Sequence, residues 1–296
     1  MMIDFHLHTV RRPGMPRDDS GDTLVPPEGL IEIMDRTGID KGVLLPLFSP
    51  EAIKWQLSTN EDILDAVEKY PDRFIPFCNI DPRTEGNTPR ANLSRQLLYY
   101  KRLGCKGVGE ITANLPITDP LVLNLFEHCQ ACEMPVLMHI SPRLGGMYGL
   151  VDVAGLKGLE RCLKLFPDLI FIGHAPAFWG EISGDLAEDM RNGYPKGPVA
   201  PGGSLPRLMS EYPNLYGDIS AGSGYNALMR DEAFGQKFMN QFNERLLMGT
   251  DVCSVNNNHQ HPYMLRRWRD EQKITSDVFE NVAWKNAARI LKLDLT

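Results

Sequence analysis

The sequence repeats one pattern along its whole length: a short apolar run, then a longer segment with helical periodicity. Eight apolar runs, rich in Val, Ile, Leu and Phe, span Ile3 to His8, Lys41 to Phe48, Phe74 to Asp81, Lys106 to Thr112, Pro135 to Ile140, Leu169 to His174, Leu215 to Ser220 and Leu246 to Asp251. The helical segments span Pro26 to Thr37, Glu61 to Tyr70, Ala91 to Leu103, Pro120 to Cys132, Leu156 to Phe166, Ser204 to Tyr212 and Ser276 to Leu291, with Ser276 as a candidate N-cap. This alternation predicts parallel strands joined by helices.

The number of repeats selects one architecture among the parallel folds. Eight strand-helix units in 296 residues predict an α/β fold of the (β/α)₈ barrel type. No Ser/Gly-rich linker divides the chain, so we expect a single domain over residues 1–296. Two segments interrupt the pattern, Arg11 to Val25 and residues 175–203. We expect residues 175–203, with their Gly/Pro-rich end, to form a lid-like insertion; an insertion without function is the alternative.

Charge and composition exclude several classes of partner. The net charge is −7 and no Lys/Arg-dense block occurs, which argues against nucleic-acid binding. No apolar run is long enough to span a membrane and no secretion signal is evident, so we expect a cytoplasmic protein with a small-molecule substrate. The oligomeric state stays open, a homo-oligomer included.

The cysteines are typical of a reducing compartment. All six are scattered without the spacing of a disulfide framework. Cys129 and Cys132 do form a C-x-x-C pair, but they lie in an amphipathic helical segment. We therefore interpret this pair as part of the core rather than as a redox or zinc motif.

Metal-ligand side chains end five of the eight predicted strands. His6 and His8 lie two residues apart and so share one face of the first strand. The fourth, fifth, sixth and eighth strands end near Glu110, His139, His174 and Asp251. In a parallel barrel these ends meet at one mouth, where barrel enzymes build their sites. Imidazole and carboxylate ligands suit Zn²⁺, with Mn²⁺, Fe²⁺ and Ni²⁺ as alternatives, and they predict an open, catalytic centre with one or two ions.

The fourth strand offers two candidates on the same face, Lys106 and Glu110. Lys106 lies four residues earlier, roughly 13 Å along an extended strand, so we expect it at the base of the barrel. Glu110 is better placed for the mouth. Its alternative role is to orient a ligand or bind substrate without touching the metal.

These motifs together resemble the amidohydrolase superfamily of metal-dependent TIM barrels, and most closely its amidohydrolase-2 and aminocarboxymuconate-semialdehyde decarboxylase-like branch. The resemblance rests on His6-Leu7-His8, on single histidines ending strands five and six, on Asp251 in "MGTD" and on the final "NAARIL" segment. It implies that His6, His8 and Asp251 bind a first metal. It also implies that His139 binds the first or a second metal and that His174 is a second-metal ligand or an acid/base catalyst. Many members use a carbamylated lysine on strand four, where this chain has Glu110.

The ligand types predict a hydrolase. A metal that lowers the pKa of water supplies a nucleophile for a carbonyl in an amide, lactone or ester, with Asp251 and His174 as catalytic residues. A metal-dependent decarboxylase of a small carboxylated substrate is the alternative, and a non-catalytic metal-binding barrel is a third reading. Three residues in loops after strand ends are candidates for substrate binding: Arg143, His259 and His261.

Overall fold

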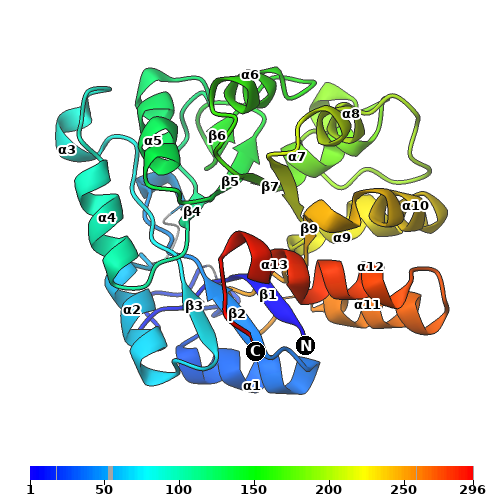
Figure 1. The fold of residues 1–296 in the computed structure, drawn as a ribbon, viewed down its shortest axis with the longest axis horizontal. Helices are drawn as coiled ribbons and strands as arrows, with labels where there is room; N and C mark the ends of the chain where they lie inside the picture. Colours follow the sequence, from blue (N-terminus) through cyan, green and yellow to red (C-terminus); the bar gives the residue numbers. More distant parts are fainter. Residues whose placement is uncertain (18, 53–55, 258, 296) are drawn as a thin grey trace.

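The computed structural model describes residues 1–17, 19–52, 56–257 and 259–295. Within these residues, eight parallel strands form a central barrel with helices around it (Figure 1). The strands are β1 (Ile3–Leu7), β2 (Lys41–Leu44), β3 (Phe74–Pro76), β4 (Val108–Ile111), β5 (Val136–Ser141), β7 (Phe171–His174), β8 (Leu215–Asp218) and β9 (Leu246–Leu247). The predicted TIM-barrel architecture is confirmed.

Two contacts join the hydrogen-bonded sheets into a ring. One sheet has the strand order β1-β2-β3 and the other β4-β5-β7-β8-β9. Cys78 and Val108 form a parallel bridge between the ends of β3 and β4. On the other side, the Phe5 N–H donates to the Met248 carbonyl at 2.8 Å. A further short strand, β6 (Leu150–Val151), pairs with the end of β5.

The helices follow the predicted segments and add others. The elements are α1 (Pro27–Thr37), α2 (Asn60–Lys69), α3 (Thr84–Asn87), α4 (Ser94–Arg102), α5 (Pro120–Ala131), α6 (Lys157–Leu165), α7 (Pro176–Trp179), α8 (Ser204–Glu211), α9 (Ala221–Met229), α10 (Glu232–Phe242), α11 (Gln260–Asp270), α12 (Ser276–Glu280) and α13 (Asn286–Ile290). The pattern had not indicated α9, α10 and α11. The cap of α12 is Thr275 rather than Ser276, because the Thr275 side chain accepts the Val278 N–H at 3.2 Å.

Apolar residues fill two layers. One lies between strands and helices and includes Cys129 and Cys132, which are buried free thiols, as predicted. The other fills the inside of the barrel, where Ile3 and Phe5 meet Ile290 of α13 in a single cluster. Figure 1 shows α13 lying over the end of the barrel where the N-terminus starts. This end is therefore closed, and the opposite end, where the strands finish, is left for a site.

Two strands that carry metal-ligand candidates are irregular. Pairing of β1 with β2 shifts between Asp4 and Leu7, and pairing of β4 with β5 shifts between Val108 and Ile111. Each shift changes which side chains face the barrel interior. Lys106 precedes β4, at the end of the barrel away from the mouth, and its side chain is exposed rather than buried inside the barrel.

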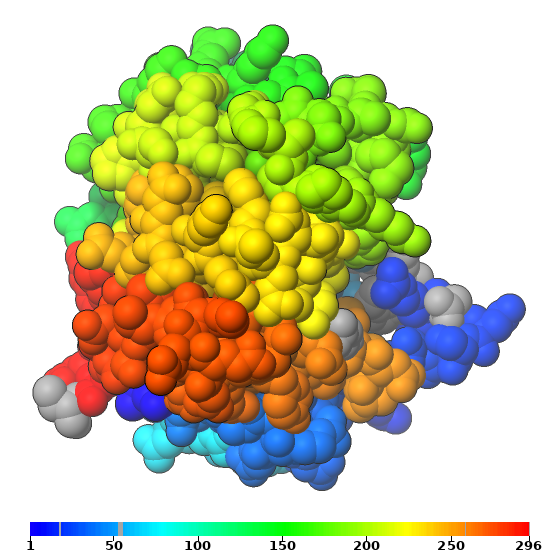
Figure 2. All heavy atoms as spheres, turned by 90° about the vertical axis from the view of Figure 1, so that its right-hand side faces the viewer, coloured from blue at the N-terminus to red at the C-terminus, as the bar shows by residue number. Residues whose placement is uncertain are grey.

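Long connections surround the open end. Figure 2 shows the segment after β1, in deep blue, projecting from the side of the molecule opposite the red C-terminal residues. Residues 175–203 contain α7 and short 3-10 turns at Gly180–Ile182 and Glu188–Met190, and Trp179 of α7 is buried. Among the described residues, no helix is long and apolar enough to cross a membrane.

Candidate metal centre and active-site cleft

The imidazole rings of His6, in β1, and His8, just after it, are each oriented by a hydrogen bond at Nδ1. The His6 Nδ1 lies 2.6 Å from Asp218 Oδ2 and the His8 Nδ1 lies 2.8 Å from the Leu45 carbonyl. Since a carboxylate and a carbonyl only accept, each Nδ1 carries the proton. The two Nε2 atoms face each other at 3.0 Å, so a proton or another cation must lie between them.

The Asp4 side chain does not point toward the histidine rings, although Asp4 precedes His6 by two residues and His8 by four. Its carboxylate accepts from the His6 N–H at 3.0 Å, from the Thr250 N–H at 2.9 Å and from the Thr250 hydroxyl at 2.5 Å. Burial raises the pKa of Asp4 to about 7. The side chain thereby ties β1 to the segment that ends at Asp251.

Glu110 and Asp251 bring two carboxylates to the same point. Glu110 Oε2 lies 3.7 Å from His6 Nε2 and 3.5 Å from His8 Nε2, while Asp251 Oδ1 lies 3.4 and 3.3 Å from them. Gly109 permits the position of Glu110: at its φ of +151° an added Cβ would lie 2.7 Å from the Leu137 carbonyl. Asp251 itself has a φ of +60°, and its backbone N–H donates to the His6 backbone carbonyl at 2.9 Å.

The histidines that end β5 and β7 meet the other oxygen of Glu110. His139 Nδ1 is 2.7 Å and His174 Nε2 is 3.9 Å from Glu110 Oε1. The His174 Nε2 also lies 3.7 Å from Asp251 Oδ2. Its Nδ1 is hydrogen-bonded to the Ser220 hydroxyl at 3.0 Å. The structure therefore brings all six predicted ligands, His6, His8, Glu110, His139, His174 and Asp251, into three overlapping groups of ligand atoms.

The electrostatics of the cluster favour positive charge beside its ionised carboxylates. Burial lowers the pKa of His6, but the charges of Asp251 and Asp218 outweigh it and hold the pKa well above its usual value. Burial raises the pKa of Glu110, yet its contacts with His139 and His6 bring the pKa well below the usual range. Asp218 is likewise shifted to a low pKa by His6 and His174 against the effect of burial.

The donor set fits a divalent metal ion. The buried Nε2 atoms of His6 and His8 lie 3.0 Å apart beside two carboxylates, an arrangement that needs a positive charge between the nitrogens, either a proton or a metal ion. Nitrogen and carboxylate oxygen are ligands for Zn²⁺ and Mn²⁺. Partners that hold the outer ring nitrogens of metal-binding histidines are a usual feature of such sites. Here the partners are Asp218, Leu45 and Ser220.

Two adjoining cavities open above the cluster. The inner cavity has a volume of about 230 Å³ and reaches His8, Glu110 and Asp251. The outer cavity, about 350 Å³, reaches His139, His174 and Asp251. Five residues line both cavities: Arg17, Tyr148, Tyr194, Ala221 and Asp251. We call the two cavities together the cleft.

A family model described as "Amidohydrolase" matches residues 3–293, nearly the whole chain. The chain belongs to the amidohydrolase family. No curated protein matches the sequence. The family, which includes enzymes, and the donor set together support a divalent metal centre in this amidohydrolase.

Solved structures share the barrel at low sequence identity. An uncharacterised TIM-barrel protein from Bordetella bronchiseptica is 19% identical over 98% of each chain, with a TM-score of 0.65. A dihydroxybenzoic acid decarboxylase from a Polaromonas species, with bound manganese, is 17% identical over 100% of this chain and 98% of its own, with a TM-score of 0.58. A probable 2-pyrone-4,6-dicarboxylic acid hydrolase from Acinetobacter baumannii is 12% identical over 99% of each, with a TM-score of 0.56. Both hydrolases and decarboxylases thus occur among the structural neighbours of this chain.

Of the three residues predicted to bind substrate, one lines the cleft and two do not. Arg143 lines the outer cavity. His261 is instead fully buried on α11, with Nε2 2.9 Å from the Ala221 carbonyl, and burial lowers its pKa to about 4. His259 precedes α11 and lines neither cavity. Neither of the two histidines therefore lines the cleft in the structure, unlike what was expected of them; Asn257 of the same loop lines the inner cavity instead.

Several residues around the centre and the cleft carried little signal in the sequence. Asp218 ends β8 and Ser220 follows two residues later, so their place at a strand end makes them candidates, but nothing distinguishes them from other polar strand ends. Tyr148 and Tyr194 lie in loops. Gly149 determines the position of the neighbouring Tyr148. Gly149 has a φ of +105°, and a Cβ added to it would lie 2.6 Å from the His139 ring, so only glycine lets the loop pass this close to that ring. The Tyr148 and His139 ring centroids are 4.4 Å apart.

Asp218 provides a test of the metal centre in this amidohydrolase. Asp218→Asn leaves every ligand atom in place but removes the charge that fixes the His6 ring. We expect metal affinity to fall roughly 10- to 100-fold, as for other partners of metal-binding histidines. Competition with a chelator would measure the change. The exposed Asp168→Asn variant is the control, and equal affinities in both variants would contradict the role of Asp218.

Proposed function

We propose that this amidohydrolase is a metal-dependent hydrolase whose centre holds two divalent cations, with Zn²⁺ as the expected metal. One observation carries the proposal: the two oxygens of Glu110 face different histidine pairs, Oε2 toward His6 and His8 and Oε1 toward His139 and His174. A carboxylate placed in this way is suited to bridge two ions.

The ligands then divide into two groups. His6, His8, Asp251 and one Glu110 oxygen would hold the first cation. His139, His174 and the other Glu110 oxygen would hold the second. When bound, such cations supply a Lewis acid that lowers the pKa of water from about 15.7 toward 7 and polarises a carbonyl.

Asp251 is placed to move the proton. Its side chain is 26% exposed, against 4% for Glu110, so it is the ligand carboxylate that reaches the cleft. It accepts a proton from the water that attacks the substrate carbonyl and returns it to the leaving oxygen or nitrogen as the carbonyl bond to that atom breaks.

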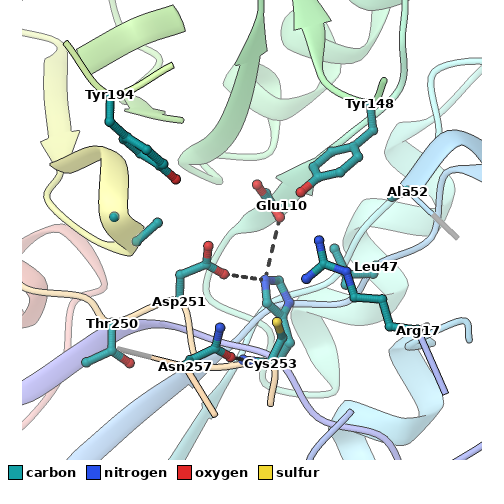
Figure 3. Close-up of a pocket in the computed structure, with 13 residues that line it drawn as sticks. Arg17, Leu47, Ala52, Glu110, Tyr148, Tyr194, Thr250, Asp251, Cys253 and Asn257 are labelled. Atoms are coloured by element: carbon teal, nitrogen blue, oxygen red, sulfur yellow. Dashed lines mark hydrogen bonds and ion pairs between the residues drawn. The ribbon is translucent and has the colours of Figure 1, made fainter. Parts of the chain in front are cut away.

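The two tyrosines would stabilise charge on the substrate. Figure 3 shows the hydroxyls of Tyr148 and Tyr194 directed into the cavity above Glu110 and Asp251. Burial and the nearby charges of Glu110 and Asp251 raise the pKa of Tyr148, and burial also raises the pKa of Tyr194. Both phenols therefore stay protonated near neutral pH and can donate hydrogen bonds to an oxyanion.

A decarboxylase of a small carboxylated substrate is the second candidate. The presence of Arg17 and Arg143 in the cleft favours it, because guanidinium groups bind carboxylates. In that reaction the bond between carbon and the carboxylate breaks, carbon dioxide leaves, and Asp251 in its protonated form delivers a proton to the carbon.

Isotope labelling distinguishes the two reactions. The zinc-loaded protein would be screened against lactones, amides, esters and carboxylated phenols. Active compounds would then be repeated in H₂¹⁸O and in D₂O. We expect ¹⁸O in the product acid. Release of carbon dioxide with deuterium on the product carbon would establish the decarboxylase instead, and absence of turnover with both zinc and manganese would favour a non-catalytic barrel.

Glu110→Gln tests the number of cations. A neutral amide bridges cations poorly, so we expect the saturated variant to bind about one ion or fewer, against about two in the wild type. Elemental analysis after gel filtration would measure both. The half-buried Glu160→Gln variant, on α6, is the matched control. A wild-type stoichiometry of one would place Glu110 as the ligand of a single ion and His174 as an acid/base group.

A further inference from the structure

A small void lies between residues 175–203 and α9, beside the cleft. Its volume of about 10 Å³ is close to the space that one water molecule needs. Residues 175–203 contribute part of α7 and the two neighbours of Tyr194 in the chain, Gly193 and Pro195. Since Tyr194 lines both cavities of the cleft, the void borders the segment that carries a cleft residue.

One face of α9 forms the other side of the void. This face consists of Ser223, Asn226, Ala227 and, at the C-cap, Arg230. Their spacing of three, four and seven residues places them on one side of a helix. The Asn226 side chain donates to the Pro195 carbonyl at 3.0 Å, so this face already holds the segment around Tyr194.

Two polar groups on this face of α9 have no partner within the described part of the chain. One is the Ser223 hydroxyl, on a residue that is only 3% exposed, and the other is the buried Nη2 of Arg230. Buried polar groups are almost always hydrogen-bonded. Each of the two therefore needs a ligand that the described residues do not supply, and both line the same void.

The charge of Arg230 favours an anion over water as this ligand. Burial lowers the pKa of Arg230, and the nearby charges of Asp185 and Asp231 oppose the shift without forming an ion pair with it among the described residues. Both carboxylates are hydrogen-bonded elsewhere. A guanidinium only donates and keeps its charge, so an acceptor with a negative charge makes the stronger hydrogen bond with it.

We propose that the void is a binding site for one small monovalent anion of the size of chloride, held by the Arg230 guanidinium and the Ser223 hydroxyl. The void is too small for sulfate, phosphate or an organic carboxylate. The anion joins the two sides of the void and so stabilises the segment that places Tyr194 in the cleft. Neither Arg230 nor Ser223 is a ligand of the metal centre, and the site does not depend on which reaction occurs there.

Bromide locates the anion, because it replaces chloride and scatters X-rays anomalously. Crystals of the wild-type protein grown with sodium bromide should show an anomalous peak between Ser223 and Arg230. Crystals of Arg230→Gln grown in the same way should lack that peak. A water molecule in the wild-type void, without anomalous signal, would overturn the proposal.

Thermal unfolding measures the effect of the anion in solution. At constant ionic strength, set with sodium gluconate, chloride at about ten times its dissociation constant should raise the unfolding temperature by roughly 2–4 °C. Arg230→Gln and Ser223→Ala should each lose most of this shift. A shift that survives in both variants would overturn the proposal, because chloride would then act at another site, such as a metal ion in the cleft.

Arg245→Gln is the matched control for Arg230→Gln. Arg245 is also half-buried and burial also lowers its pKa, but its side chain donates to the Tyr212 carbonyl at 3.0 Å and does not line the void. The chloride shift in this variant should equal that of the wild type.

Hydrogen exchange tests the link between the anion and Tyr194. If opening of residues 185–199 releases the anion, chloride at ten times its dissociation constant should slow their amide exchange about 10-fold in the wild type. It should have no such effect in Arg230→Gln. Equal exchange rates in the wild type with and without chloride would contradict the role of the anion in holding this segment.

Discussion

Asp251→Asn is expected to retain metal and to lose nearly all turnover, by about 10²- to 10⁴-fold, the usual cost of removing a general base. Asparagine keeps the shape of the side chain and one oxygen directed at His6 and His8, so it still offers a ligand. It cannot take a proton from water. Steady-state kinetics on the substrate found by labelling, together with elemental analysis of the same sample, would measure both properties.

The matched control for this prediction is Asp168→Asn. Asp168 is exposed and is not one of the residues that line the two cavities. Its replacement should leave the catalytic rate near that of the wild type. An Asp251→Asn enzyme that is loaded with metal and turns over at a near wild-type rate would show that another group, His174 first, handles the proton.

His6→Ala and His8→Ala are each expected to weaken metal binding by more than about 100-fold, beyond the roughly 10- to 100-fold typical of residues that only orient ligands. Each change removes a ligand nitrogen at the point where four ligand atoms converge. It also removes a side chain that is fully buried or nearly so, which leaves a cavity. Metal content after gel filtration and a thermal unfolding curve should be recorded together.

His128→Ala separates loss of metal from loss of stability. This histidine joins α4 to α5 through the Ser94 hydroxyl at 2.7 Å and the Ala91 carbonyl at 3.0 Å, away from the cleft. We expect it to lower the unfolding temperature while the metal content stays at the wild-type value. Full metal occupancy in both His6→Ala and His8→Ala would remove these residues from the centre.

The sequence alone determined the barrel and most of its centre. Alternation of apolar runs and helical periodicity is a local property, and eight such units leave few parallel architectures. Because parallel strands end at one mouth, His6, His8, Glu110, His139, His174 and Asp251 could be placed together from their positions at strand ends. In the structure, ligand atoms of these six side chains form three overlapping groups, with the atoms of each group within 4.8 Å of one another.

Only the tertiary structure decided which neighbouring side chains face the centre. Strict alternation places Asp4 with His6 and places Lys106 with Glu110. The shifts in pairing within β1 and β4 separate both pairs, so Asp4 bonds backbone groups and Thr250 while Lys106 is exposed. A bulge depends on the partner strand and on contacts such as that between Gly109 and Leu137, which no local pattern encodes.

The walls of the cleft were decided in the same way. Arg17, Tyr148, Tyr194 and Asn257 line the cleft from four connections far apart in the sequence. Two of these connections are held by distant side chains: Asn226 donates to the Pro195 carbonyl, and Asn256 donates to Asp22. His261 was a reasonable candidate by its type, yet α11 begins just before it and buries it against Ala221. Periodicity indicates which face of a strand or helix is apolar. The path of a loop depends instead on hydrogen bonds between segments that are brought together only when the barrel closes.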